Sequence, residues 1–284
     1  MTDADTETLE HAPRAQAPAF DALAPAYDAS FGATALGRAL RALVWQGLDE
    51  AFAGCRRVLE LGCGTGDDAL HLASRGVAVL ATDASSAMLR AAAAKAEAAG
   101  HAGRVTFRCL PMERLGGVLA GERFDGVLSN FGAVNCAGDV GRVAADVAEL
   151  LVPGAPLVWV VMGKHVPWEW AWFLARGEGR KAFRRSRSGG VAWRGLQISY
   201  PTPAELERAL RPHFAPVSRR PLGAALPPTY ASGWLERSPR AFAALLRLER
   251  SLHRRQALAV LADHYIFEAR RTDTRRTARA AADA

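Results

Sequence analysis

The chain has 284 residues and a mass of 30.4 kDa, enough for one large domain or one domain with a substantial insertion. Half of the residues are hydrophobic and 23% are charged, which allows a full-sized core and excludes a disordered chain. The net charge of +7 divides unevenly, with −6 over residues 1–150 and +13 over the rest. A basic second half attracts anionic partners, although an Arg-rich, GC-biased composition is an alternative explanation.

The cysteines and the N-terminus indicate a cellular compartment. Cys55, Cys63, Cys109 and Cys136 form no CxxC pair, so neither a zinc knuckle nor a disulfide framework is indicated, and a cytoplasmic location is expected. Residues 1–10 lack the features of a signal peptide, and no apolar run approaches a membrane span. No metal is expected, because no His, Cys and Asp cluster has ligand spacing.

Strands and helices alternate in the first half of the chain, after a stretch of helical spacing between Phe20 and Ala53. The expected strands span residues 57–61, 77–82, 105–110, 124–129 and 156–161. The expected helices span residues 67–75, 85–99 and 140–151. This alternation predicts crossover units and a parallel sheet covered on both faces.

The pattern breaks after Gly163. Residues 164–195 combine four tryptophans with several arginines and are interpreted as an insertion or lid. Helices are then expected over residues 203–210 and 241–252, separated by a Pro-rich loop, and a last strand over 264–269.

The domain organisation follows from these elements. Polar tails are expected to be disordered over residues 1–15 and 272–284. Between them we predict a single domain over residues 16–271. Its parts are a helical cap (16–54), a cofactor-binding core (55–163), the insertion (164–200) and a C-terminal part (201–271).

The sharpest motif is a glycine-rich loop between the first strand and the next helix, with the sequence ELGCGTGDD from Glu60 to Asp68. Such a turn lets a ligand approach the backbone closely. A dinucleotide fingerprint would need a glycine at Asp67, and carboxylates beside a pyrophosphate would repel it. Backbone N–H groups with nearby acidic side chains suit a zwitterionic amino acid instead, which disfavours a nicotinamide-dependent enzyme.

Asp83 supplies a second half of the site, at the end of the second strand and 21 positions after Gly62. An acidic residue at that distance binds the ribose hydroxyls of a nucleoside. An amino acid on one side and a ribose on the other describe S-adenosylmethionine.

These residues resemble the class I S-adenosylmethionine-dependent methyltransferase family. The resemblance runs from about Val58 to Val161 and covers four segments in order: VLELGCGTG, ATDASSAML, FDGVLSNFGAVN and LLVPGAPLVWVV. It implies a Rossmann-like seven-stranded sheet, S-adenosyl-L-methionine as cofactor and S-adenosyl-L-homocysteine as product.

The resemblance also implies roles for individual residues. The methionine portion would face Glu60, Gly62, Gly64 and Gly66, and Cys63 and Thr65 of the same loop would also lie at the cofactor. The ribose would bind Asp83 and Ala84, the adenine would pack on Met88, and Asn130, Phe131 and Gly132 would form the floor below the sulfonium. Tyr27, followed by Asp28, matches a Tyr-Asp pair of the family's N-terminal cap.

One position departs from the family pattern. The family commonly has Asp-Ala after the third strand to hold the adenine amine, where this chain has Leu110-Pro111-Met112-Glu113. The backbone near Met112 or the side chain of Glu113 is expected to replace that aspartate.

Methyl transfer needs the nucleophile in line with the S–CH₃ bond, and a base only where the acceptor must lose a proton. His165 and Asn135 are the candidate catalytic residues, because each follows a strand at the carboxyl end of the sheet. Three interpretations of the insertion stay open: a lid around an aromatic or anionic acceptor, an interfacial helix on anionic lipid, or packing over the sheet. The candidate substrate residues are Trp168, Trp172, Arg176 and Tyr200.

We therefore predict methyl transfer to oxygen, nitrogen or carbon of a small organic acceptor, either aromatic, prenylated or anionic. An RNA or protein methyltransferase and a catalytically silent cofactor-binding module are the alternatives. Nucleic acid is disfavoured, because no RNA-binding module is recognisable. Peripheral membrane contact stays open, and the sequence does not decide the oligomeric state.

Overall fold

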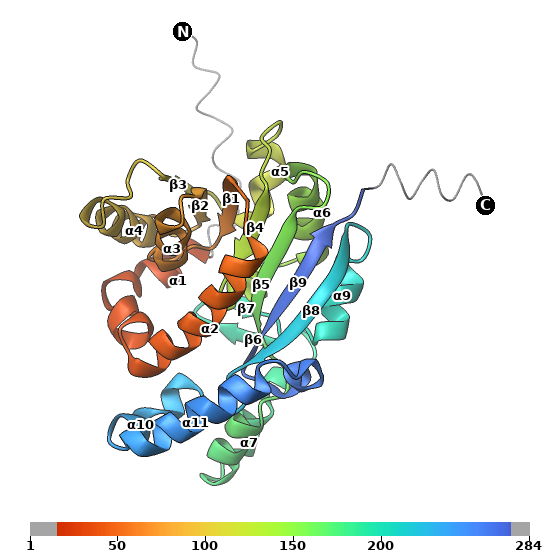
Figure 1. Cartoon of the computed structure of the whole chain (residues 1–284). Helices are drawn as coiled ribbons and strands as arrows, with labels where there is room; N and C mark the ends of the chain where they lie inside the picture. The colour runs from red at the N-terminus through yellow and green to blue at the C-terminus, as the bar shows by residue number, and fades with distance from the viewer. Residues whose placement is uncertain (1–15, 274–284) are drawn as a thin grey trace, which may run out of the picture.

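A seven-stranded sheet in the order β3-β2-β1-β4-β5-β9-β8 forms the centre of the computed structural model, which describes residues 16–273 (Figure 1). Strands β1 to β5 are parallel, and β9 is antiparallel to both of its neighbours. The strands are β1 (Arg57–Leu61), β2 (Ala78–Asp83), β3 (Val105–Cys109), β4 (Gly126–Ser129), β5 (Pro156–Met162), β8 (Phe214–Leu222) and β9 (His264–Arg271). The expected Rossmann-like, mostly parallel sheet is confirmed.

Helices cover both faces of this sheet. One face packs against α2 (Ala35–Ala51), α3 (Asp67–Ser74), α4 (Ser86–Ala98) and α11 (Pro239–Leu252). The other packs against α5 (Leu115–Val118), α6 (Val140–Leu150) and α9 (Pro203–Leu210). The side chains of strand β5 alternate between the two faces. Trp159 packs with the α5, α6 and α9 side, and its neighbours Val158 and Val160 pack with the α2, α3 and α4 side, so the strand is apolar throughout. A strand buried on both faces has no polar side to alternate with.

The N-terminal cap is more broken than the helical spacing predicted. Helix α1 (Gln16–Asp21) is followed by a short 3-10 turn (Ala24–Ala26) and a π turn (Asp28–Gly32) before α2 begins. Pro25 cannot donate a backbone hydrogen bond, and the Thr34 side chain caps α2 by accepting from the amide of Gly37. The Asp21 carboxylate accepts a hydrogen bond of 2.6 Å from the Ser85 hydroxyl, which fastens the end of α1 to the start of α4.

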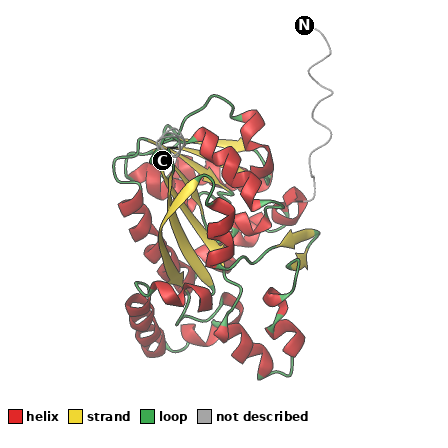
Figure 2. Cartoon of the chain, turned by 90° about the vertical axis from the view of Figure 1, so that its right-hand side faces the viewer, coloured by secondary structure: helices red, strands yellow, loops and turns green. Residues whose placement is uncertain are grey.

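The segment after β5 contains elements that the sequence did not predict. Helices α7 (Pro167–Leu174) and α8 (Gly179–Ala182) precede a hairpin of β6 (Val191–Trp193) and β7 (Leu196–Ile198). Figure 2 shows this hairpin as a separate two-stranded ribbon beside the main sheet. Helix α10 (Gly233–Glu236) leads into α11.

The chain ends were predicted to be disordered tails. Thr272 contradicts this at its own position, because its amide donates a hydrogen bond of 2.9 Å to the carbonyl of His213. The remaining tail positions, 1–15 and 274–284, lie outside the described residues. Within the described range, no helix has both the length and the apolar character needed to cross a bilayer.

Candidate functional site

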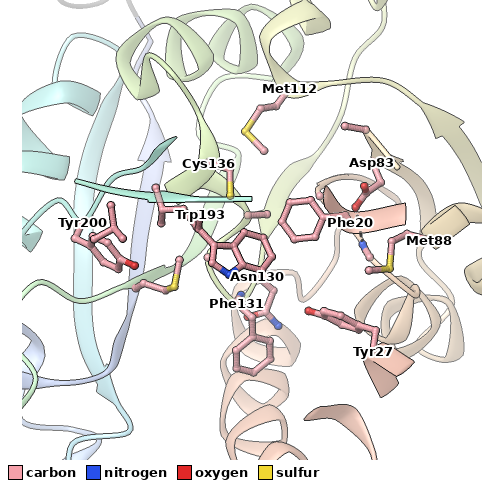
Figure 3. A pocket seen from close by; sticks show the side chains of 18 of the residues that line it. Phe20, Tyr27, Asp83, Met88, Met112, Asn130, Phe131, Cys136, Trp193 and Tyr200 are labelled. Carbon is pink, nitrogen blue, oxygen red and sulfur yellow. Dashed lines mark hydrogen bonds between the residues drawn. The ribbon is translucent and has the colours of Figure 1, made fainter. Parts of the chain in front are cut away.

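A cavity of about 360 Å³ opens at the carboxyl ends of β1, β2, β4 and β5 (Figure 3). The strand order reverses between β1 and β4, and ligands of open α/β sheets bind at such a switch point. The loops after these strands line one side of the cavity. Phe20 of α1 and Trp193 of β6 line it as well, with their ring centroids 5.8 Å apart.

The glycine loop after β1 has a backbone that only glycine fits. Gly62 has a φ of +65°, and a Cβ atom there would lie 2.3 Å from the Cβ of Ala133 in the loop after β4. Gly66 has a φ of +82°, and its Cβ would lie 2.8 Å from that of Ala92 in α4. The missing side chains therefore let three segments meet around the cavity.

The substitution Gly62→Ala tests this cradle. We expect lower stability and weaker cofactor binding, because the added methyl must displace the loop after β4 as well as occupy a left-handed conformation. Gly54→Ala is the matched control: its φ is +84°, but a Cβ there would meet nothing within 4 Å. It should cost only the left-handed strain of about 1–2 kcal/mol and leave cofactor affinity unchanged. Equal thermal shifts and equal affinities in the two variants would contradict the packing role of Gly62.

Asp83, at the end of β2, faces the cavity from beside the glycine loop. Its Oδ2 accepts from the Gly64 amide at 2.9 Å, and its Oδ1 accepts from the Ser85 amide at 2.8 Å. Burial raises the pKa of Asp83, and the two amides oppose that rise. Each carboxylate oxygen keeps acceptor capacity, so the side chain can receive two further hydroxyl groups.

The loop after β4 holds a strained residue at the cavity. Phe131 has a φ of +43°, an uncommon conformation for a bulky residue. Asn130 supports it by accepting from the Phe131 amide and donating to Oδ2 of Asp68, each at 2.8 Å. The Phe131 ring packs against Phe31 at a centroid distance of 4.7 Å. Strain of this kind is found where a site requires a fixed backbone.

The acidic residues at the end of the glycine loop are paired with cations. This corrects the expectation from the sequence that these carboxylates alone would meet the ammonium group of a ligand. Nη1 of Arg41 lies 2.7 Å from Asp68, and Nζ of Lys95 lies 2.7 Å from Asp67. A small cavity of about 30 Å³ lies between Arg41, these two carboxylates and the glycine loop. It offers a cation and carboxylates together, which suits a zwitterion better than an isolated ammonium group.

Glu60 lies behind this loop, with 1% of its surface exposed. Burial, and then the charge of Asp68, raise the pKa of its carboxyl group well above the usual value. Its Oε2 is buried without a hydrogen-bond partner among the described residues. Glu60 lines neither cavity, so any influence on a ligand would pass through the loop.

The structure brings together most of the predicted cofactor residues. Those that line the main cavity are Tyr27, Gly62, Gly64, Asp83, Ala84, Met88, Met112, Asn130, Phe131 and Gly132. Cys63 and Thr65 line only the small cavity, and Gly66 and Glu113 line neither. Burial raises the pKa of Tyr27 to about 12, so its phenol stays protonated at neutral pH. Figure 3 shows its hydroxyl pointing inward.

The two catalytic candidates do not line the cavity. The Asn135 side chain is fully buried and bridges the backbone, donating to Ser199 and accepting from the Met162 amide. That role fixes the end of β5 and leaves its amide no access to an acceptor. His165 packs against Trp170, with ring centroids 6.1 Å apart.

The substrate candidates divide in the same way. Tyr200 lines the cavity, but Trp168, Trp172 and Arg176 do not. The indole of Trp168 donates to the carbonyl of Ala225 at 2.9 Å, and Arg176 stacks on Trp172 at 3.4 Å.

Besides Tyr200, the insertion brings Trp193 into the cavity. Trp193 is followed by a left-handed Arg194 and then Gly195 in the tight hairpin turn. Sequence reasoning also missed Phe20, Arg41, Arg184 and Arg185 as site residues. Only the hairpin had a local signal, a short alternating run interrupted at Gly195.

Comparisons with known proteins match part of the chain to methyltransferases. Residues 58–154 match the family described as "Methyltransferase domain". Over 147 residues the chain is 31% identical to the ubiquinone/menaquinone biosynthesis C-methyltransferase UbiE of Geotalea daltonii, which covers 49% of this chain. The match spans 59% of the length of that relative.

Solved structures share the fold at low sequence identity. The [4+2]-cyclase SpnF aligns with a TM-score of 0.58 and 18% identity, over 89% of this chain and 94% of that one. Geranyl diphosphate C-methyltransferase from Streptomyces coelicolor A3(2) gives 0.54 and 13%, over 82% and 79%. The CcbJ methyltransferase from Streptomyces caelestis gives 0.53 and 19%, over 83% and 90%.

The family match begins within β1 and contains the glycine loop, Asp83 and the strained loop after β4, which are the segments that form the floor of the cavity. Over residues 58–154 the chain thus matches a methyltransferase-domain family, and the matched segment contains the glycine loop and Asp83.

Proposed function

We propose that this chain transfers a methyl group from S-adenosylmethionine to a small organic acceptor bound in the same cavity. The observation that carries this proposal is the convergence of the glycine loop, Asp83 and Phe131 on one cavity that extends to the aromatic wall at Trp193. The glycine loop and Asp83 suit an amino acid joined to a nucleoside, and the space toward Trp193 leaves room for an acceptor beside it.

The residues present fit the cofactor. The small cavity at Arg41 would hold the carboxylate and ammonium groups, and Asp83 would bind the ribose hydroxyls. Met88, Leu110 and Met112 would form an apolar surface for the adenine ring. When bound, S-adenosylmethionine supplies an activated methyl group, so the chain's part is to orient the reactants and to exclude water.

The acceptor is inferred from the other wall. Phe20, Phe131, Val191, Trp193 and Ile198 supply an apolar and aromatic lining. This favours an aromatic or prenylated compound over a strongly hydrated one.

Calorimetric titration with S-adenosylhomocysteine tests the cofactor, with NADH as the control. We expect one molecule of S-adenosylhomocysteine to bind per chain and NADH not to bind. Failure of S-adenosylhomocysteine to bind would overturn the proposed function. Transfer of labelled methyl groups to aromatic and prenylated acceptors would then separate an enzyme from a binding module, since both predict binding but only the enzyme predicts turnover.

A further inference from the structure

The acceptor side of the cavity has one polar end. Its wall is otherwise aromatic and aliphatic, and Figure 3 shows the Trp193 indole near its centre, beside Phe20 and Cys136. The polar groups at the other end are Arg184, Arg185 and Tyr200. Two adjacent guanidinium groups in an apolar cavity require an explanation, because a buried charge is costly without a partner.

Arg185 is fully committed to the protein. Its Nε lies 2.8 Å from Oε2 of Glu169, and its Nη2 donates to Oδ1 of Asp263 at 2.8 Å. Its Nη1 donates to the carbonyls of Gly163 and Asp263. The Arg185 side chain is 8% exposed. This arginine ties the insertion to the end of the sheet, and both of its terminal amino groups bind protein oxygen atoms.

Within the described part of the chain, only the Nε edge of the Arg184 guanidinium has a protein partner. Its Nε lies 2.8 Å from Oε1 of Glu169, and its guanidinium lies over the rings of Phe173 and Tyr230 at 5.4 and 5.7 Å. Its two terminal amino groups form no hydrogen bond with any described residue, and its side chain is 32% exposed. Arg184 lines the cavity, and its terminal amino groups can bind a carboxylate or phosphate bidentately.

Tyr200 stands at the same end. Its hydroxyl makes no hydrogen bond with a described residue, and Figure 3 shows it directed toward the cavity. Its ring lies 5.2 Å from the Arg185 guanidinium. Burial raises the pKa of Tyr200, so at neutral pH its phenol is a donor that can add a third hydrogen bond to an anion.

The carboxylates near Arg184 are already paired with other groups, so the Arg184 end of the cavity can bind one more anion. Glu169 is 1% exposed, lies 2.8 Å from the Nε atoms of Arg184 and Arg185, and accepts a hydrogen bond from the Tyr230 hydroxyl. Asp263 is paired with Arg185 and His264. Asp83, the acidic side chain among the described cavity residues, belongs to the ribose region. Neither carboxylate near Arg184 is therefore free to compete for its terminal amino groups.

We propose that Arg184 and Tyr200 form an anion-binding subsite of the acceptor pocket, so that the acceptor is an apolar or aromatic molecule carrying a carboxylate or phosphate. This inference rests on the proposed function, since it locates the acceptor relative to the cofactor. Glu169 positions Arg184 by holding its Nε, and Arg185 holds Glu169 in turn. The subsite would orient the acceptor and select against uncharged analogues.

Paired probes test the subsite: 1-naphthoate with 1-naphthamide, and geranate with geranamide, titrated calorimetrically into the full chain saturated with S-adenosylhomocysteine. We expect at least one carboxylate to bind about tenfold more tightly than its amide, because hydrogen bonds to a charged group contribute about 1.5–3 kcal/mol. Arg184→Gln should remove that preference, Arg184→Lys should restore part of it, and Tyr200→Phe should reduce it by a smaller factor.

The control is Arg187→Gln, an exposed arginine of the same segment that does not line the cavity. It should keep the wild-type preference. S-adenosylhomocysteine affinity should be unchanged in Arg184→Gln, which separates this proposal from the proposed function. The melting temperature should fall, because Glu169 loses one of its two cations. If S-adenosylhomocysteine binds but neither carboxylate is preferred, or if Arg187→Gln loses the preference as fully as Arg184→Gln, the subsite assignment is wrong.

Discussion

Replacing Arg185 with Met is expected to lower the free energy of unfolding by about 3–5 kcal/mol, the range for removing one partner of a buried ion pair. Asp263, whose side chain is 12% exposed, would lose its closest cation, and Glu169, whose side chain is 1% exposed, would lose one of its two cations. Burial opposes ionisation of Asp263, but Arg185 and then His264 outweigh it and hold the pKa of Asp263 below its usual range. Urea unfolding of the purified variant at neutral pH measures the loss.

Arg187→Met is the matched control, because it removes an exposed arginine of the same segment and should change stability by no more than about 0.5 kcal/mol. Combining Arg185→Met with Asp263→Asn should recover part of the loss, since the second change removes a buried charge whose closest cation the first removed. A loss below about 1 kcal/mol in Arg185→Met, or no recovery in the double variant, would show that the pair does not anchor the insertion.

Acidification gives a second measure of the same anchor. The pKa of Asp263 is lower in the folded chain than in the unfolded one, so its contribution to stability is full above the ordinary aspartate range. That contribution is lost as the pH falls toward the depressed folded value. In Arg185→Met, where the main cause of the depression is absent, less stability should be lost on acidification.

The sequence predicted the parallel half of the sheet well, because each of these strands is a short apolar run ended by a turn. It failed at β8, whose sequence FAPVSRRPL contains two prolines and two arginines. Proline is tolerated on an edge strand, and β8 is the outer strand beside β9, with an irregularity between Pro216 and Ser218. The neighbour that makes this segment a strand lies about fifty residues later, so no local pattern reveals it.

The site residues likewise divide into those with a local sequence signal and those that depend on partners distant in sequence. The glycine loop and Asp83 could be found because their spacing is local and their chemistry demands particular residue types. Arg41 and Arg184 could not, since each becomes a site residue only through partners distant in sequence, Asp68 for one and Glu169 for the other. Composition directed attention to Trp168 and Trp172, whereas the turn at Gly195 is what brings Trp193 to the cavity.

Replacing Asp83 with Ala is expected to weaken S-adenosylhomocysteine binding by about tenfold or more, equivalent to about 1.4 kcal/mol or above. The carboxylate has a backbone donor on each oxygen and faces the cavity, so the ribose hydroxyls would find a fixed, charged acceptor. Burial raises the pKa of Asp83, so wild-type affinity should also fall on acidification at a higher pH than for an ordinary aspartate. Calorimetry over a pH series measures both effects.

Loss of affinity alone would not prove a ribose contact, because Asp83 also holds the amides of Gly64 and Ser85. A double-mutant cycle with the 2′-deoxy analogue of S-adenosylhomocysteine separates the two roles. The wild type should prefer the hydroxylated ligand, and Asp83→Ala should bind both ligands alike if the carboxylate contacts the ribose. If the variant still prefers the hydroxylated ligand by the wild-type factor, Asp83 acts only by holding the glycine loop, and another group must bind the ribose.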